Sequence, residues 1–292
     1  MLSEPAAGLR NRPHRGCFPT IAVSLLTVAA IVFGGGCSKV ETVVPTTPTQ
    51  TDVSQAALRI CTTGDYKPLT YRDPTTGQYS GIDIDMAKDL AAHLGRTPTF
   101  VPTTWVTLMK DIATPGKCDI AMGGISPTQA REQAADFTPP YLANGKTPLT
   151  AAANADRFQT VAQINQHGVR VIEPAGGTNE QFAKQSLPDA TLIVDQDNTA
   201  VFGQLVAGTA DVMVTDAIEA IYQSKQHPEL VAVHPDKPFT ADHKAYMLPK
   251  GSKLSQQTTA WLNQALTDGT FTRIYNEWMQ SPSVWKSTPP VG

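Results

Sequence analysis

Two carboxylates, Asp216 and Glu219, stand three residues apart in the stretch VTDAIEA, where the pattern predicts that a strand runs into a helix. Residues three apart share one face of a helix, so both acids can face the same cleft. One acid suffices for a pocket that holds an amine, whereas a pocket that also protonates a leaving group needs a second. A glutamate in a first helical turn also occurs simply as a partner of the helix dipole, so the spacing alone leaves these interpretations open.

Other polar residues follow predicted strands in the same way. Ligands of open α/β sheets bind at the carboxyl ends of the strands, so such positions are candidate ligand contacts. In this chain they are Thr63, Asp65, Tyr66, Trp105, Gly123, Gly124, Ser126, Gly176, Gly177, Thr178 and Asn179.

Two features suit an anionic group on the ligand. In AGGTNE, glycines before a helix N-terminus let backbone N–H groups approach an anion, and Thr178 or Asn179 adds a side-chain donor. A plain capped turn has the same spacing. Arg131 lies five residues after Ser126 on a predicted helix, and its guanidinium suits a carboxylate, although a lone arginine on a helix is also commonly a solvated surface group.

The elements that position these residues alternate short apolar strands with helices. The first set of strands and helices covers 58–64, 84–95, 99–105, 105–113, 118–126 and 128–137. A second set begins at 168, and the chain ends in two helices at 254–267 and 270–279. This order predicts an α/β protein of two lobes, each a parallel-rich sheet flanked by helices, with a ligand cleft between them.

Composition excludes several classes of function. With 292 residues, of which 41% are hydrophobic and 17% charged, the chain is long enough for one or two domains with real cores. The net charge of -3, and the lack of a Lys/Arg cluster beyond the N-terminus, exclude nucleic acid as an expected partner. Neither the cysteines nor the six histidines have metal-site spacing, so we expect no metal and no cofactor.

Residues 1–37 have the order of an export signal. The arginines of RNRPHR precede an apolar run at 21–33, three glycines and Cys37. The apolar run is too short for a comfortable membrane span. Small residues directly before Cys37 indicate cleavage there and lipid attachment to its thiol, as in bacterial lipoproteins; a simple cleaved signal and an uncleaved anchor are the alternatives. In each case the folded part lies outside the cytoplasm.

The remaining boundaries follow from composition and from the order of elements. The Thr/Pro-rich segment 38–56 is predicted to be an extended tether. We expect lobe 1 to comprise 57–150 and 247–292, and lobe 2 to comprise 151–246.

Cys61 and Cys118 are the cysteines of the mature domain. One lies near the end of a predicted strand and the other at the start of a strand, so parallel pairing separates them along the sheet. We therefore expect two buried thiols rather than a disulfide, despite the oxidising compartment.

From about residue 58 to 279 the chain resembles the type II periplasmic solute-binding fold of polar amino-acid transporters. The runs that carry this resemblance are TTGDYKPLTY, GIDIDMAKDLA, TTWVTLM, CDIAMGGIS, GKTP, GGTNE, VTDAIEA and HPDKPFTADHKAYMLP. More narrowly, TTGDYKP, GKTP and TDAIE resemble the cyclohexadienyl dehydratases, enzymes built on that fold. This resemblance implies an exported carbon–oxygen lyase that converts prephenate to phenylpyruvate, or arogenate to phenylalanine, with loss of water and carbon dioxide.

The resemblance also implies roles for individual residues. Glu219 becomes the general acid, and it can hold its proton near neutral pH only if burial raises its pKa. Lys146 of GKTP holds the substrate and the leaving hydroxyl, Asn179 hydrogen-bonds near the acid, and Asp65 has a supporting polar role. Asp216 corresponds to the acid with which amino-acid binders hold an α-amino group, and a structural role is the alternative here. The implied substrate-binding residues are Tyr66, Trp105, Gly124, Ser126, Arg131, Gly177, Thr178 and Asp216.

Without the resemblance, Lys146 also fits an exposed loop and Trp105 a core position. One departure stands out: the chain reads EPAGG at 173–177 where the dehydratases carry an Asn-Pro-Gly-Gly turn, and Glu173 brings an extra acid nearby.

The alternative function is that of an amino-acid-binding lipoprotein of an ABC importer. In that case Asp216 and Arg131 clamp a zwitterion, no bond is broken, and a membrane permease is the partner. The joint presence of Lys146 and Glu219 favours the enzyme. For either function the ligand is a small molecule, and we expect the lobes to close by hinge motion near 147–151 and 246–249.

Overall fold

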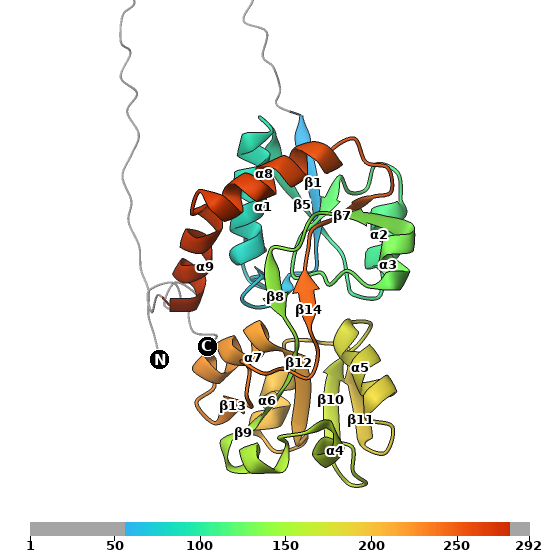
Figure 1. Cartoon of the computed structure of the whole chain (residues 1–292), viewed down its shortest axis with the longest axis vertical. Helices are drawn as coiled ribbons and strands as arrows, with labels where there is room; N and C mark the ends of the chain where they lie inside the picture. Colours follow the sequence, from blue (N-terminus) through green and yellow to red (C-terminus); the bar gives the residue numbers. More distant parts are fainter. Residues whose placement is uncertain (1–55, 281–292) are drawn as a thin grey trace, which may run out of the picture. The chain divides into compact units, whose positions relative to one another are not determined.

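The computed structural model describes residues 56–280, which contain two five-stranded sheets (Figure 1). We call each sheet with its helices a lobe. The predicted export signal, Cys37 and all of the predicted tether except residue 56 lie outside the described residues, as do residues 281–292.

The first lobe is built on a mixed sheet. Its strand order is β5 (Thr97–Pro102), β1 (Ala57–Thr62), β6 (Ile120–Ala121), β15 (Met247–Pro249) and β7 (Ala135–Phe137). β1 runs parallel to β5 and β6, whereas β15 runs antiparallel to β6 and β7. Side chains alternate along β1, so that Leu58 and Ile60 pack into one cluster and Cys61 into another on the opposite face.

Helices cover both faces of this sheet (Figure 1). The Leu58 face packs against α1 (Ile82–His93), α8 (Ser255–Thr267) and α9 (Thr270–Gln280). The Cys61 face packs against α2 (Leu108–Ala113), next to α3 (Gln129–Ala134). Between β1 and α1 lies a small antiparallel sheet of β2 (Asp65–Tyr66), β3 (Thr70–Arg72) and β4 (Tyr79–Ser80).

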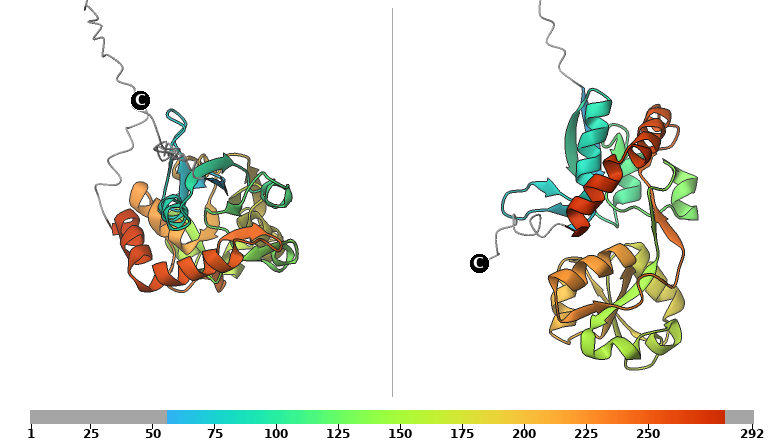
Figure 2. Two further views of the ribbon diagram at one scale, coloured as in Figure 1. Left: turned by 90° about the horizontal axis from the view of Figure 1, so that it is seen from above. Right: turned by 60° about the vertical axis from the view of Figure 1, so that its left-hand side comes forward.

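The second lobe repeats this arrangement. Its strand order is β11 (Thr191–Asp195), β10 (Arg170–Pro174), β12 (Val212–Asp216), β9 (Lys146–Ala151) and β13 (Leu230–Ala232). β10 runs parallel to β11 and β12, and β9 runs antiparallel to both of its neighbours. One face packs against α6 (Val201–Val206) and α7 (Ala217–Gln226), and the other against α4 (Val161–Ile164) and α5 (Thr178–Ser186), as the right-hand view of Figure 2 shows. A 3₁₀ helix, η1 (Ala152–Arg157), follows β9.

The chain passes between the lobes through β8 (Leu142–Asn144) and β14 (Asp242–Lys244), which pair with each other in antiparallel fashion. The expected boundary after residue 150 is therefore displaced, because residues 146–151 form β9 inside the second sheet. The expected hinge segments at 147–151 and 246–249 likewise belong mostly to sheet strands, so β8 and β14 are the segments that cross. The predicted two-lobe α/β architecture is confirmed, and each five-stranded sheet contains both parallel and antiparallel pairs.

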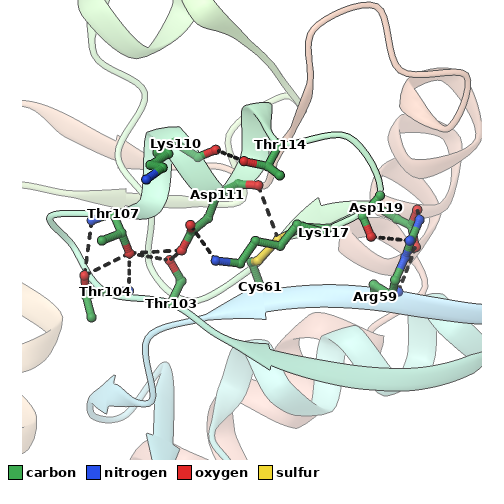
Figure 3. Close-up of a disulfide and its surroundings, with 12 residues drawn as sticks. Arg59, Cys61, Thr103, Thr104, Thr107, Lys110, Asp111, Thr114, Lys117 and Asp119 are labelled. Carbon is green, nitrogen blue, oxygen red and sulfur yellow. Dashed lines mark hydrogen bonds and ion pairs between the residues drawn. A yellow bond between two sulfur atoms is a disulfide. The ribbon is translucent and has the colours of Figure 1, made fainter.

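Cys61 and Cys118 form a disulfide, and their Cα atoms are 5.6 Å apart (Figure 3). The prediction of two free thiols is wrong. The strand expected from residue 118 begins only at Ile120, and a bend at Asp119 separates Cys118 from it. Because that bend is not extended, Cys118 packs with Cys61 on the α2 face of the sheet instead of lying further along the strand.

Candidate active site

Polar residues from both lobes line one cavity of ≈ 350 Å³, a volume that includes its opening to solvent. Two hydrogen bonds cross between the lobes beside it: the Tyr66 hydroxyl donates to Asp216 at 2.5 Å, and Asn198 Nδ2 donates to the Asp65 carbonyl at 2.9 Å. The predicted site residues that line the cavity are Tyr66, Trp105, Gly124, Ser126, Arg131, Gly177, Thr178, Asn179, Asp216 and Glu219.

Asp216 lies at the centre of the site, at the end of β12 and the start of α7. Its Oδ1 accepts a hydrogen bond from Lys146 Nζ at 2.9 Å, and its Oδ2 accepts bonds from Lys244 Nζ and the Tyr66 hydroxyl, each at 2.5 Å. Burial acts to raise the pKa of Asp216, but the two ammonium groups and these hydrogen bonds outweigh it, so the pKa falls well below its usual range. Asp216 is therefore a buried, ionised carboxylate.

Lys146 is the first residue of β9 and lies opposite Asp216 in the antiparallel register. Its buried ammonium group also donates to Thr178 Oγ1 at 2.9 Å and to Asn179 Oδ1. Lys146 itself does not line the cavity, although three of its partners do. The alternative of an exposed loop lysine is wrong, because pairing with β12 buries this position.

Lys244, on β14, is a site residue that the sequence analysis missed. Its Nζ donates to Asp216 Oδ2 and, at 3.0 Å, to Ser126 Oγ, and it lies 5.3 Å from the centroid of the Tyr66 ring. Burial lowers its pKa, and Asp216 opposes that effect. The available signal was a lysine directly before the apolar run AYML, which is unusual for a solvated loop.

Glu219, in the first turn of α7, is completely buried and lines the cavity. Its Oε2 accepts a hydrogen bond from the Thr215 hydroxyl at 2.5 Å, and its Oε1 has no hydrogen-bond partner among the described residues. Burial, supported by the negative charge of Asp216, raises the pKa of Glu219 to about 8. A carboxyl group in this state is protonated at neutral pH and can donate a proton into the cavity.

Glu173, the extra acid of the EPAGG turn, is also completely buried. Its Oε1 accepts the backbone N–H of Val214 at 2.7 Å, and burial raises its pKa well above the usual range. The side chain does not line the cavity. Burial therefore disfavours a negative charge on Glu173, which lies outside the cavity lining.

Arg131 is buried on α3 and lines the cavity, so the alternative of a solvated arginine is wrong. Its Nη1 donates to the Ser126 carbonyl at 2.9 Å, and burial lowers its pKa. Gly124, with φ +73°, lies close beneath Tyr66: a Cβ there would overlap the tyrosine ring. This contact explains why the position requires glycine.

Tyr66 and Trp105 form an aromatic wall of the cavity. Their rings meet edge to face, with centroids 5.8 Å apart and planes at 76°. Trp105 also packs against both hydrophobic clusters of the first lobe, so it serves the core as well as the cavity. This geometry suits a flat, six-membered ring.

Asp65, the remaining predicted site residue, does not line the cavity. Its side chain is partly exposed, and burial of its carboxyl group raises its pKa. Its charge nevertheless acts on Glu219, since it helps to raise the pKa of that acid. Over residues 56–280, no group of three or more His, Cys, Asp or Glu side chains is arranged to hold a metal ion.

Comparison with known proteins identifies the family of this chain. Residues 58–281 match the bacterial extracellular solute-binding proteins, family 3. The chain belongs to this family. The family consists of extracellular proteins. Across residues 56–280, no helix of this chain has the length and apolar character needed to cross a bilayer.

Two kinds of relative stand close to this solute-binding protein. A cyclohexadienyl dehydratase of Pseudomonas aeruginosa is 46% identical over 228 residues, which cover 78% of this chain and 84% of that protein. The solved structure of an ancestral amino acid-binding protein, a precursor of cyclohexadienyl dehydratase, has a TM-score of 0.70 and 37% identity, covering 77% of this chain and 96% of that one. An ancestral arginine-binding protein bound to arginine has a TM-score of 0.69 and 26% identity, covering 77% and 99%. The resemblance inferred from the sequence motifs is thus confirmed.

Proposed function

We propose that this protein is an exported cyclohexadienyl dehydratase that acts on prephenate, arogenate or both. The observation that carries the proposal is Glu219: a buried carboxyl group with a pKa of about 8 that lines the cavity and has one oxygen without a hydrogen-bond partner among residues 56–280. An amino-acid receptor has no use for such a proton donor. The 46% identity to a named cyclohexadienyl dehydratase supports the same function.

The proposed reaction consumes one proton, which Glu219 supplies. The bond between the ring and its carboxylate breaks, and the electron pair moves into the ring, which becomes aromatic. The bond between the opposite ring carbon and its hydroxyl breaks, and the oxygen leaves with the proton of Glu219. Carbon dioxide, water and phenylpyruvate (or phenylalanine) result. Glu219 is left as a carboxylate, and a proton from solvent restores it.

The cationic groups of the site hold the substrate carboxylates. Arg131 and the N-terminus of α5, at Gly177 and Thr178, take one carboxylate, because a guanidinium and free backbone N–H groups both suit that anion. Asn179 lines the cavity and positions the leaving hydroxyl near the acid, and Lys146, which lies outside the lining, holds Asn179 by donating to its Oδ1. This placement leaves the aromatic wall to contact the ring.

Asp65 has a supporting electrostatic role. Its negative charge helps to keep the proton on Glu219, although its side chain lies outside the cavity lining. Closure of the lobes serves the same end, because excluding water keeps an uncharged acid favoured over its carboxylate.

The test is to add prephenate to residues 38–292 of the protein. The absorbance of phenylpyruvate in alkali then measures how much product forms. Glu219→Gln removes the proton but keeps the shape, and it should lower kcat by about 10²–10⁴-fold, as expected for a lost general acid. The matched control is Glu277→Gln, at an exposed glutamate of α9 paired with Arg273, and it should retain the full rate. Equal rates for wild type and Glu219→Gln would remove the assignment of Glu219.

The second candidate is an amino-acid-binding lipoprotein of an ABC importer, with Cys37 as the lipid attachment site and a permease as partner. Two observations favour this second function. The cavity is lined by both Arg131 and Asp216, and an amino acid-binding relative has a similar known structure. Under this function the folded protein forms no product, but its midpoint of thermal unfolding rises when an amino acid is added. Mass spectrometry of the membrane fraction tests lipidation of Cys37 separately.

A further inference from the structure

We propose that Lys244 converts Asp216 from a receptor for an ammonium group into an internal counter-ion, so that the site selects a ring dicarboxylate with a keto side chain over one with an amine. In terms of substrate this means prephenate over arogenate, and the inference rests on the proposed function. Amino-acid binders leave the corresponding carboxylate open to the α-amino group, whereas here it is occupied.

The first argument is occupancy. Asp216 accepts three hydrogen bonds from within the protein, two from ammonium groups and one from a phenol, although a carboxylate has about four acceptor positions. Lys244 is held in place independently, because its Nζ also donates to Ser126 Oγ at 3.0 Å and its side chain is buried. A substrate amine would enter as a third ammonium group on the same carboxylate.

The second argument is charge. Arg131, Lys146 and Lys244 carry three positive charges in this cluster. Two negative charges oppose them, that of Asp216 and that of Asp83, which is buried behind Gly124 and acts on Lys244, so an excess of one positive charge remains. Glu219 does not offset this excess, because burial raises its pKa to about 8 and keeps it protonated at neutral pH. Burial also raises the pKa of Glu173 well above its usual range, and its side chain does not line the cavity. Asp65 lies outside the cavity lining.

A keto dicarboxylate carries two negative charges and no positive one, so it offsets this excess without bringing another cation into the cluster. An amino dicarboxylate brings one more positive charge among three, and a basic amino acid brings two positive charges with only one negative charge. Repulsion between like charges is strong in a buried site, because little water screens it. The chain therefore retains Asp216, which corresponds to the amine-binding acid of the amino-acid binders, and Lys244 on β14 neutralises its charge.

The experiment measures equilibrium binding by calorimetry in the Glu219→Gln background, in which turnover of the ligands is expected to be slowed by about 10²–10⁴-fold. Prephenate and arogenate are titrated into four proteins: that background alone, and with Lys244→Met, Lys244→Met plus Asp216→Asn, or Lys110→Met. The last variant is the matched control, because Lys110 is an exposed lysine of α2 remote from the cavity lining. Thermal unfolding checks that each protein folds, and Lys244→Gln replaces Lys244→Met if the latter does not.

We expect the background and the Lys110 control to bind prephenate at least about tenfold more tightly than arogenate, a difference of about 1.4 kcal/mol. Lys244→Met should shift this ratio toward arogenate by about tenfold or more, and the added Asp216→Asn should cancel the shift because the freed amine receptor is gone. Tighter or equal binding of arogenate to the background, no binding of prephenate, or an unchanged ratio in Lys244→Met would overturn the inference.

These outcomes separate the inference from the proposed function. Binding selectivity is read without turnover, so a protein that forms no product can still show it. Conversely, a protein that dehydrates both substrates at equal affinity keeps its proposed function and loses only the role of Lys244.

Discussion

Glu219→Gln is expected to stabilise the folded protein at neutral pH, although it removes the proposed acid. Burial raises the pKa of Glu219 from 4.5 to about 8. The folded state therefore keeps the proton while the unfolded chain ionises above 4.5, and the free energy of unfolding falls as pH rises between these two values. At about 1.4 kcal/mol per pH unit, the free energy of unfolding is lower than at pH 4.5 by about 3 kcal/mol at neutral pH and by about 5 kcal/mol at pH 8.

The glutamine amide does not titrate, and it can keep the hydrogen bond with Thr215. Urea unfolding of wild type and variant at a series of pH values measures the difference directly. The two proteins should be about equally stable near pH 4.5, and the variant should gain an advantage of about 3 kcal/mol by neutral pH. Glu173 is common to both proteins, so its own pH dependence cancels in the difference.

Glu277→Gln is again the matched control, because that glutamate is exposed and should give a difference that hardly varies with pH. The reasoning is refuted if the stability difference for Glu219→Gln is constant with pH, or if the variant is the less stable protein at neutral pH. Either result would mean that Glu219 is ionised in the folded state, and an ionised glutamate cannot serve as the general acid.

Three further predictions follow from the same structure. The value of kcat/KM for prephenate should fall about tenfold per pH unit above a pKa of about 8, as Glu219 loses its proton; a flat alkaline limb would contradict this. Asp83→Ala should lower the free energy of unfolding by about 3 kcal/mol or more, because three buried donors, the hydroxyls of Tyr141 and Tyr246 and the Gly124 N–H, lose their acceptor; an unchanged urea midpoint would speak against it. Reduction of the disulfide, which closes a separation of 57 residues, should lower stability by about 4 kcal/mol, whereas free thiols detected in the native protein by mass spectrometry would exclude the bond.

The sequence predicted the fold class well because the alternation of strands and helices is a local signal. Periodicity placed the helices at 254–267 and 270–279, close to α8 and α9. It did not place the crossing between lobes, because GKTP reads equally well as a loop and as a strand start. Only the pairing of β9 with β12 shows that Lys146 belongs to the second sheet.

The candidate site was predictable where polar residues follow strands, and less so where burial comes from a distant segment. Asp216 ends β12 and Glu219 lies in the first turn of α7, and the structure brings both to the cavity. Lys244 was missed, because its partners Asp216 and Ser126 are far away in sequence and meet it only through β14, and the lysine before the apolar run AYML does not by itself identify them. The disulfide was missed for a related reason: strand register says nothing about a bend just before the strand.

Formation of phenylpyruvate from prephenate, compared between wild type and Glu219→Gln, is the most direct test of the proposal that this solute-binding protein is an enzyme. We predict product from the wild-type protein and a kcat lower by about 10²–10⁴-fold in the variant, with KM changed little because the shape of the side chain is kept. A folded wild-type protein that releases no phenylpyruvate, yet gains thermal stability from an amino acid, would contradict the enzyme and establish a receptor instead.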